Sequence, residues 1–280
     1  MNAIPDRQIK KARKLIREIH AAVMAGDTEA LRKLEDTFYE IPVELNGGEA
    51  FGSADMKDAL AAACAAADGE VPLWGQAGRF FLCVDGMPAV VEYEPEHSHQ
   101  IALHAVLNDT LFISETGYRC MYMHLPAKLH RGKTVDQAAA DIIRSTQAEK
   151  KQLMIPPADR SLPDDLLVQP FVNAGIEQYL ASLPQPGAIV EVNAIGAPKT
   201  IGVVLRIHPQ PLPEAPWIEV AYFAQPPRRQ ALPKAVIKEQ LVAHELRRLD
   251  EQELEASDSI GKYLTIGMVE ALEAIREPIA

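Results

Sequence analysis

A proline-rich segment near the middle of the sequence most constrains how this chain can fold. Residues 154–170 (MIPPADRSLPDDLLVQP) contain four prolines, and 14 of the 21 prolines of the chain lie between Pro156 and Pro233. Proline lacks a backbone N–H and fixes φ, so such a segment is stiff and is excluded from the interior of a sheet. We therefore predict a linker over 154–170 that joins a domain at 1–153 to a second domain at 171–280.

The part before this linker predicts helices followed by an antiparallel meander and a closing helix. Pro5 suits the first turn of the first helix, Gly26 its end, and Asp27 the cap of the next helix. Asp85-Gly86 is a strong hairpin signal between two β-type runs. After the first helix we expect further helices at 28–40, 54–67 and 134–153, and five strands at 79–84, 89–94, 101–107, 111–114 and 118–124.

The part after the linker predicts a small sheet with flanking helices. Residues 209–216 are too rich in proline to lie inside a sheet and are expected to form a loop. The whole chain is therefore predicted to be α+β. In this second domain we expect a helix at 171–183, three strands at 188–195, 200–208 and 217–224, and two helices at 234–256 and 259–276.

The net charge is distributed unevenly along the chain. The sequence has 28 Lys+Arg and 39 Asp+Glu, a formal charge of −11, but residues 1–20 are formally +4 because six of them are basic and two acidic. The basic residues Arg7, Lys10, Lys14 and Arg17 recur at helical spacing and share one face. Such a strip could contact RNA, DNA or an acidic partner, or it could be the solvated face of a helical hairpin.

Several classes of protein are excluded or disfavoured by composition. The longest apolar run, at 59–67, is far below the roughly 18 residues that a membrane span needs. The start of the chain has no apolar core typical of a signal peptide, and three cysteines are too few for a disulfide scaffold. The charge of −11 argues against coating of nucleic acid or an anionic membrane. We therefore expect a cytoplasmic protein that does not associate with membranes.

An aromatic strand is the first candidate binding site. Residues 114–119 (SETGYR) join two predicted strands, and Glu115, Tyr118, Arg119 and Tyr122 lie at this junction. Tyrosine and arginine are the residue types that anchor protein interfaces. These four residues are predicted to form a partner-binding patch. The alternative is an ordinary strand with one face in the core.

A histidine cluster raises the question of a metal site. His97 and His99 are two residues apart, so in a strand they would point to the same side, and His104 could complete a ligand set. No second metal-binding motif accompanies them, so a polar loop is the favoured interpretation and we expect no metal or other cofactor. The spacing of Cys120 and His124 is too long for a nucleophile pair on a strand, and we assign no catalytic residue.

Two resemblances bear on function. Residues 186–192 with 200–207 resemble the opening strands of small SH3-like barrels, including RNA-cleaving toxins of the MazF type, without a matching catalytic hydroxyl. Residues 111–120 (LFISETGYRC) and 132–144 (GKTVDQAAADIIR) resemble segments of uncharacterised proteins of bacterial plasmids and integrative elements. That second resemblance implies a genomic setting in which anti-CRISPR, anti-restriction and plasmid-maintenance proteins occur.

The leading hypothesis is a non-catalytic protein that binds another macromolecule. An acidic body can occupy a basic site that is built for nucleic acid, and its charge would steer the encounter. The expected partner is a host protein or nucleoprotein complex, for example a CRISPR effector, which the protein would inhibit. Two alternatives stay open: a metal-dependent or RNA-cleaving enzyme, and a plasmid regulator that binds nucleic acid through its first helix.

Overall fold

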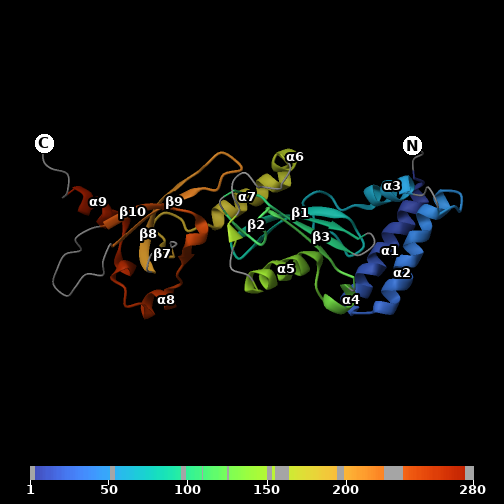
Figure 1. The fold of residues 1–280 in the computed structure, drawn as a ribbon, viewed down its shortest axis with the longest axis horizontal. Coiled ribbons are helices and arrows are strands. Elements are labelled where there is room, and N and C mark those ends of the chain that lie inside the picture. The colour runs from blue at the N-terminus through green and yellow to red at the C-terminus, as the bar shows by residue number, and fades with distance from the viewer. Residues whose placement is uncertain are drawn as a thin grey trace. The chain divides into compact units, whose positions relative to one another are not determined.

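The computed structural model confirms an α+β protein and divides the chain into two compact units (Figure 1). Unit 1 comprises residues 1–106, 112–153 and 159–175, and unit 2 comprises 107–111, 154–158 and 176–280. No helix in the described part of the chain is both long and apolar enough to cross a membrane. The structure describes residues 4–50, 54–95, 99–108, 110–124, 126–149, 153–154, 164–193, 199–223 and 236–274.

Unit 1 begins with the expected helices, α1 (Asp6–Ala25), α2 (Thr28–Leu45) and α3 (Ala54–Cys64). Gly26 ends α1 at a φ of 78°, and the Asp27 carboxylate accepts a hydrogen bond from the backbone N–H of Ala30, both as predicted. α2 continues five residues beyond the expected end, with Pro42 inside its last turns. The helices share an apolar core of Ala12, Leu15, Ile16, Ile41, Leu60 and Cys64.

The first sheet of unit 1 is an antiparallel meander in the order β1-β2-β3-β5. Asp85 and Gly86 both have positive φ, 51° and 80°, as a primed hairpin turn requires. α5 contacts β1 and lies along one face of the sheet (Figure 1). The elements are β1 (Gly78–Val84), β2 (Met87–Glu94), β3 (Gln100–Ala105), β5 (Tyr118–Tyr122), α4 (Pro126–Leu129) and α5 (Val135–Glu149).

The prediction of five strands in this meander is wrong by one strand. β4 (Leu111–Phe112) pairs with β6 (Leu153–Met154) in a separate two-stranded sheet. The cause lies in residues 107–111, which belong to unit 2. There the Asn108 N–H donates to the carbonyl of Pro213 at 2.8 Å, and the Asn108 amide donates to the Glu214 carboxylate at 3.0 Å. This detour removes the segment from the meander, so β5 pairs directly with β3.

The proline-rich segment contains described structure at both of its ends. Met154 belongs to β6, and α6 (Asp164–Leu167) lies near the other end. Residues 155–163 lie outside the described residues. α7 (Pro170–Ser182) follows, and its first part belongs to unit 1 and its second part to unit 2.

Unit 2 contains a five-stranded sheet, which corrects the expectation of three strands. Its order is β10-β9-β8-β7-β11, with every neighbouring pair antiparallel. The helix expected over 234–256 is largely absent, because β10 pairs along β9 and β11 pairs along β7. The strands are β7 (Ile189–Val192), β8 (Thr200–His208), β9 (Trp217–Phe223), β10 (Val236–Leu241) and β11 (Leu246–Arg248).

Short helices complete unit 2. The predicted loop between β8 and β9 is confirmed. The helix expected over 259–276 is divided into a 3-10 turn and α9, and both contact β8. Their shared core contains Val203, Ala221, Phe223, Leu264 and Val269. The elements are η2 (Ala243–Glu245), α8 (Glu251–Ala256), η3 (Ile260–Tyr263) and α9 (Ile266–Ala274).

Candidate functional site

The four basic residues of the predicted strip lie on the exposed side of α1. Arg7, Lys10, Lys14 and Arg17 are all solvent-exposed. Lys14 forms an ion pair with Glu18 at 3.5 Å, whereas the other three have no ion pair with any residue that the structure describes. The strip is therefore an exposed cationic surface on the side of α1 opposite the apolar face that packs into unit 1.

The structure separates the predicted aromatic patch into two faces of β5. Tyr118 and Tyr122 share one face, where they are 38% and 58% exposed, and the exposed Glu115 lies in the preceding loop. Arg119 alternates to the other face and is partly buried. β5 is an edge strand of its sheet, so one side of its backbone is not paired within that sheet. The two tyrosines and this edge form one accessible surface.

The histidines of the suggested metal site bind separate carboxylates. His99 Nε2 lies 2.6 Å from Glu35, and His104 Nε2 lies 3.2 Å from Glu92. The hydrogen bond from His104 is the main reason that the pKa of Glu92 is lowered. His97 lies outside the described residues. Within the residues that were placed, no three His, Cys, Asp or Glu side chains gather in a way that could hold a metal ion.

Sequence reasoning missed a cavity of about 410 Å³ in unit 1, where α2 faces the ends of β2, β3 and β5. Glu35 lines this cavity together with His99, and residue spacing on α2 places Leu31, Glu35 and Phe38 on the same face. The side chain of Glu35 is 41% exposed, whereas that of His99 is 6% exposed. A carboxylate in contact with solvent is thus held by a buried imidazole.

A chain of hydrogen bonds extends from this carboxylate into the core. His99 Nδ1 lies 2.6 Å from the Tyr93 hydroxyl, and the Gly75 N–H donates to that hydroxyl oxygen at 3.2 Å. All three bonds form together when the Tyr93 hydroxyl donates to Nδ1 and the Nε2–H group donates to Glu35, which assigns the tautomer of His99. Burial of Tyr93 raises its pKa far above the usual value, so this hydroxyl stays a donor.

Backbone and aromatic contacts fix the position of His99. Its φ of 47° lies in the left-handed region, which is uncommon for residues other than glycine. The Trp74 ring meets Tyr93 edge to face, with centroids 5.5 Å apart, and lies 6.0 Å from the His99 ring. Glu35 and His99 are 64 residues apart in the sequence, so no local spacing could reveal their pairing.

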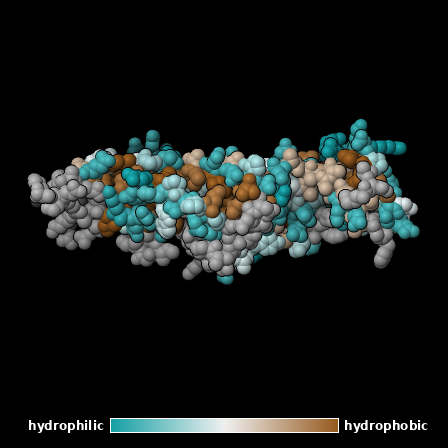
Figure 2. All heavy atoms as spheres, turned by 90° about the horizontal axis from the view of Figure 1, so that it is seen from above, coloured by the Kyte–Doolittle hydropathy of each residue, from teal (hydrophilic) through white to brown (hydrophobic). Residues whose placement is uncertain are grey.

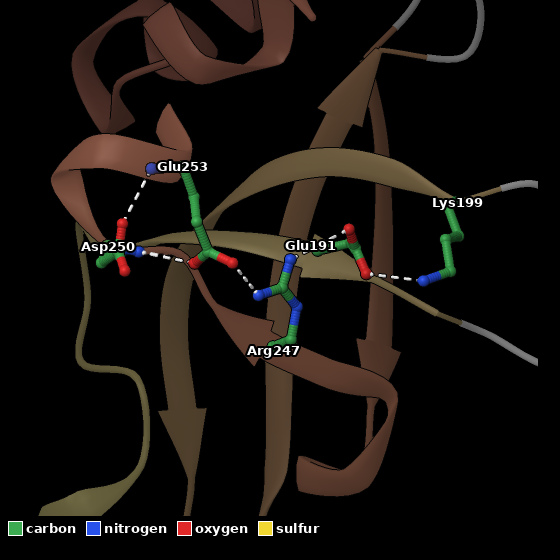
Figure 3. Close-up of polar contacts among 5 residues, drawn as sticks. All are labelled: Glu191, Lys199, Arg247, Asp250 and Glu253. Carbon is green, nitrogen blue, oxygen red and sulfur yellow. Dashed lines mark hydrogen bonds and ion pairs between the residues drawn. The ribbon is translucent and has the colours of Figure 1, made fainter. Parts of the chain in front are cut away.

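Unit 2 contains a second cavity, of about 330 Å³, beside a network of ion pairs (Figure 3). Glu191 on β7 accepts from Lys199 at 3.0 Å and from Arg247 at 3.3 Å. Arg247 also donates to Glu253, and Glu253 completes the capping box of α8 with Asp250. Every charge drawn in Figure 3 thus has a partner, and the network joins β7, β11 and α8. We assign it a structural role.

Replacement of Glu191 by glutamine is expected to destabilise unit 2 by about 1 kcal/mol at neutral pH. The hydrogen bond from Lys199, and then that from Arg247, holds the pKa of Glu191 below its ordinary value of 4.5. A lowered pKa gives stability that is present above 4.5 and is lost as the pH falls through the folded-state value. Urea unfolding should therefore show that the free energy of unfolding of E191Q is lower than that of wild type. This difference should be constant from neutral pH to about pH 5.5 and should shrink in more acidic solution.

The exposed Glu270 on α9 provides the control for this pH series. The E270Q variant should match wild type within about 0.5 kcal/mol over the same range. A difference between wild type and E191Q that grows as the pH falls would contradict the assignment of this network.

The fold and sites described so far define an α+β protein with two larger antiparallel sheets and a Glu–His–Tyr hydrogen-bond chain that runs from a solvent-exposed carboxylate into the core of unit 1. Comparison with known proteins adds a specific relation. Residues 77–153, which include the sheet of unit 1 and α5, match the family described as KlcB third domain. No solved structure matches the chain.

Two proteins of Escherichia coli, both named Protein KlcB, are similar to this chain. One is 39% identical over 196 residues, which cover 62% of this chain and 46% of the relative. The other is 43% identical over 110 residues, which cover 36% of this chain and 23% of the relative. The chain thus matches less than half of the length of these relatives. The comparisons therefore show a relation to proteins named KlcB over part of this chain.

Proposed function

We propose that the chain is a non-catalytic binding protein, encoded by a mobile element, that inhibits a host protein or nucleoprotein complex in the cytoplasm. The observation that carries this proposal is the exposed pair Tyr118 and Tyr122 on the edge strand β5. Edge strands present unpaired backbone groups to partners, and tyrosines supply large contact areas at a low entropy cost. A CRISPR effector is one example of such a partner, and the relation to KlcB supports the mobile-element setting.

Other surface features agree with a binding role. Figure 2 shows apolar and hydrophilic groups interspersed on the face that it displays, as expected for a surface that stays hydrated until a partner covers it. Tyr122 stacks on His124 with ring centroids 6.4 Å apart, and Tyr118 lies 5.0 Å from the His104 ring. These contacts hold both tyrosines in place and reduce the entropy that binding would cost.

Replacing both tyrosines by alanine is expected to weaken binding of the host partner. The immobilised wild-type protein should retain a specific host protein from a nuclease-treated bacterial lysate, and the Y118A/Y122A variant should weaken that interaction at least tenfold, as loss of an interface anchor does. Mass spectrometry would identify the partner, and binding to the purified partner would give the ratio of affinities. Because both side chains are exposed, the variant should unfold within about 1 kcal/mol of wild type.

The control is Tyr263→Ala, since Tyr263 is 65% exposed in unit 2 and remote in sequence from β5. This variant should capture the partner as wild type does. Capture that survives in Y118A/Y122A would contradict the proposal. If capture instead depends on nucleic acid and is lost when Lys10, Lys14 and Arg17 are changed to glutamate, the result would favour the alternative hypothesis. In that hypothesis the chain is a plasmid regulator that binds nucleic acid through α1.

A further inference from the structure

The cavity in unit 1 presents one carboxylate oxygen that is held in place and has no hydrogen-bond partner among the described residues. Glu35 Oε1 accepts from His99, and within the described chain Oε2 receives no hydrogen bond. His99 and Tyr93 are 5% and 0% exposed, so the groups that orient this carboxylate are themselves fixed in the core. Because buried hydrogen bonds already position this carboxylate, binding a donor costs it little additional conformational entropy.

An exposed cation, the guanidinium of Arg32, lies beside this carboxylate. Arg32 precedes Glu35 by three residues on α2, so their Cβ atoms are neighbours about 5–6 Å apart on the helix surface. Arg32 is exposed, lines the same cavity and has no ion pair in the described part of the chain. The two side chains form no ion pair with each other there either. The cavity therefore offers adjacent positive and negative groups to one ligand.

The remaining lining sets the size and polarity of that ligand. Ile19 and Leu31 are buried, and Phe38 is half-buried, which gives the cavity an apolar wall. The volume of about 410 Å³ lies at the lower end of the range for small-molecule sites. Lys57 and Asp36 also line the cavity, so its four charged residues, with Arg32 and Glu35, sum to zero. The lining thus favours a ligand without net charge.

We propose that this cavity binds a free α-amino acid with a large apolar side chain, with its ammonium group on Glu35, its carboxylate on Arg32 and its side chain against Ile19, Leu31 and Phe38. The short spacing of the two charges on α2 selects this class of ligand. A simple amine would leave Arg32 without a partner. A nucleotide carries its phosphate and its base donors much farther apart, and a peptide separates its two termini. This site goes beyond the proposed partner binding and does not use Tyr118 or Tyr122.

Calorimetric titration of the full chain with L-leucine, L-phenylalanine and L-tryptophan tests the proposal. At least one should bind saturably in the micromolar to millimolar range. The N-acetyl derivative removes the ammonium charge and the amide derivative removes the carboxylate, so each should bind at least about tenfold more weakly than the free amino acid. Equal binding of either derivative, or no binding of any of the three amino acids, would overturn the proposal.

Substitutions on α2 locate the site. Glu35→Gln retains a carbonyl oxygen that accepts from His99 but loses the charge, and Arg32→Gln removes the guanidinium. Each should weaken binding at least about tenfold. Lys33→Gln is the matched control, because Lys33 is exposed on the same helix, pairs with Glu29 at 2.7 Å and does not line the cavity. Its affinity should equal that of wild type. Unchanged binding in E35Q would overturn the proposal. Tyr118→Ala should bind the amino acid normally even if partner capture fails, because Tyr118 packs on His104 and neither residue lines the cavity.

Discussion

Replacement of Trp74 by alanine is expected to destabilise unit 1 by about 3–5 kcal/mol, which is the usual cost of truncating a large buried aromatic side chain. Trp74 is 0% exposed, and its Nε1–H group donates to the carbonyl of Lys133 at 2.8 Å. Its backbone N–H donates to His20 Nδ1 at 3.3 Å, which connects it to α1. Alanine would leave a cavity and a buried carbonyl without its partner.

The aromatic neighbours of Trp74 add to this cost. Its ring stacks on His130 with centroids 5.9 Å apart and contacts Tyr93 on β2 edge to face. One side chain thus packs against groups from the loop before α5 and from the sheet of unit 1. Burial lowers the pKa of His130, so this stacked ring stays uncharged at neutral pH. Truncation of Trp74 should therefore loosen the packing around His99 as well as lower the stability of the unit.

Urea unfolding followed by circular dichroism would measure the change, and hydrogen exchange would locate it in β2, β3 and α5. The matched control is Trp217→Ala, because Trp217 begins β9 in unit 2 and is 37% exposed. The control should cost about 1 kcal/mol or less and should leave exchange in unit 1 unchanged. A loss for Trp74→Ala no larger than that of the control would refute the central role of Trp74.

The elements of unit 1 that sequence predicted correctly are those with local signals. Helix α1 has apolar residues at helical spacing, a glycine that adopts a positive φ and a following Asp27 cap. Asp85-Gly86 defined the first hairpin because both residues adopt the left-handed conformation. In each case the residues that determine the structure lie within a few positions of one another.

The errors occurred where distant segments decide the structure. Residues 236–241 (VIKEQL) include Lys, Glu, Gln and Leu, which favour a helix, yet they pair with β9 as β10. Residues 111–112 resemble a meander strand but pair with β6, because Asn108 bonds to Pro213 and Glu214 in unit 2. Tertiary pairing overrode local propensity at both places, and no pattern within either segment reports its partner.

Some features of the candidate sites likewise follow from local sequence, whereas others depend on contacts between distant segments. The exposure of Arg7, Lys10, Lys14 and Arg17 followed from helical periodicity alone. The separation of Arg119 from Tyr118 and Tyr122 also follows from strand alternation, but it required the strand boundaries. The Glu35–His99 pair required the packing of α2 against the sheet, and Glu35 is one of 39 acidic residues with no local feature that distinguishes it.

Replacement of Gly261 by alanine is expected to destabilise unit 2 by about 1–3 kcal/mol, the usual range for overpacking a well-filled interior. A Cβ atom at this position would lie 2.2 Å from the backbone oxygen of Ile201. That oxygen belongs to β8, which is paired on both sides, by β7 and by β9, and therefore cannot move freely. The 3-10 turn η3 would have to withdraw from β8, and Leu264 would lose part of its packing in the core of unit 2.

Gly267 provides the control because a Cβ atom there meets nothing within 4 Å, and it lies near the start of α9. Gly267→Ala should leave stability unchanged or raise it by up to about 1 kcal/mol, since alanine favours a helix. Hydrogen exchange should rise in β8 and β9 for Gly261→Ala and stay at the wild-type level in β2 and β3. Trp74→Ala should have the opposite effect, with faster exchange in β2 and β3 and wild-type exchange in β8 and β9. These two results are expected if residues 1–153 and 171–280 are separate domains, as we propose. Equal changes in both sheets for either variant would contradict that division, because they would show that the two units unfold as one cooperative structure.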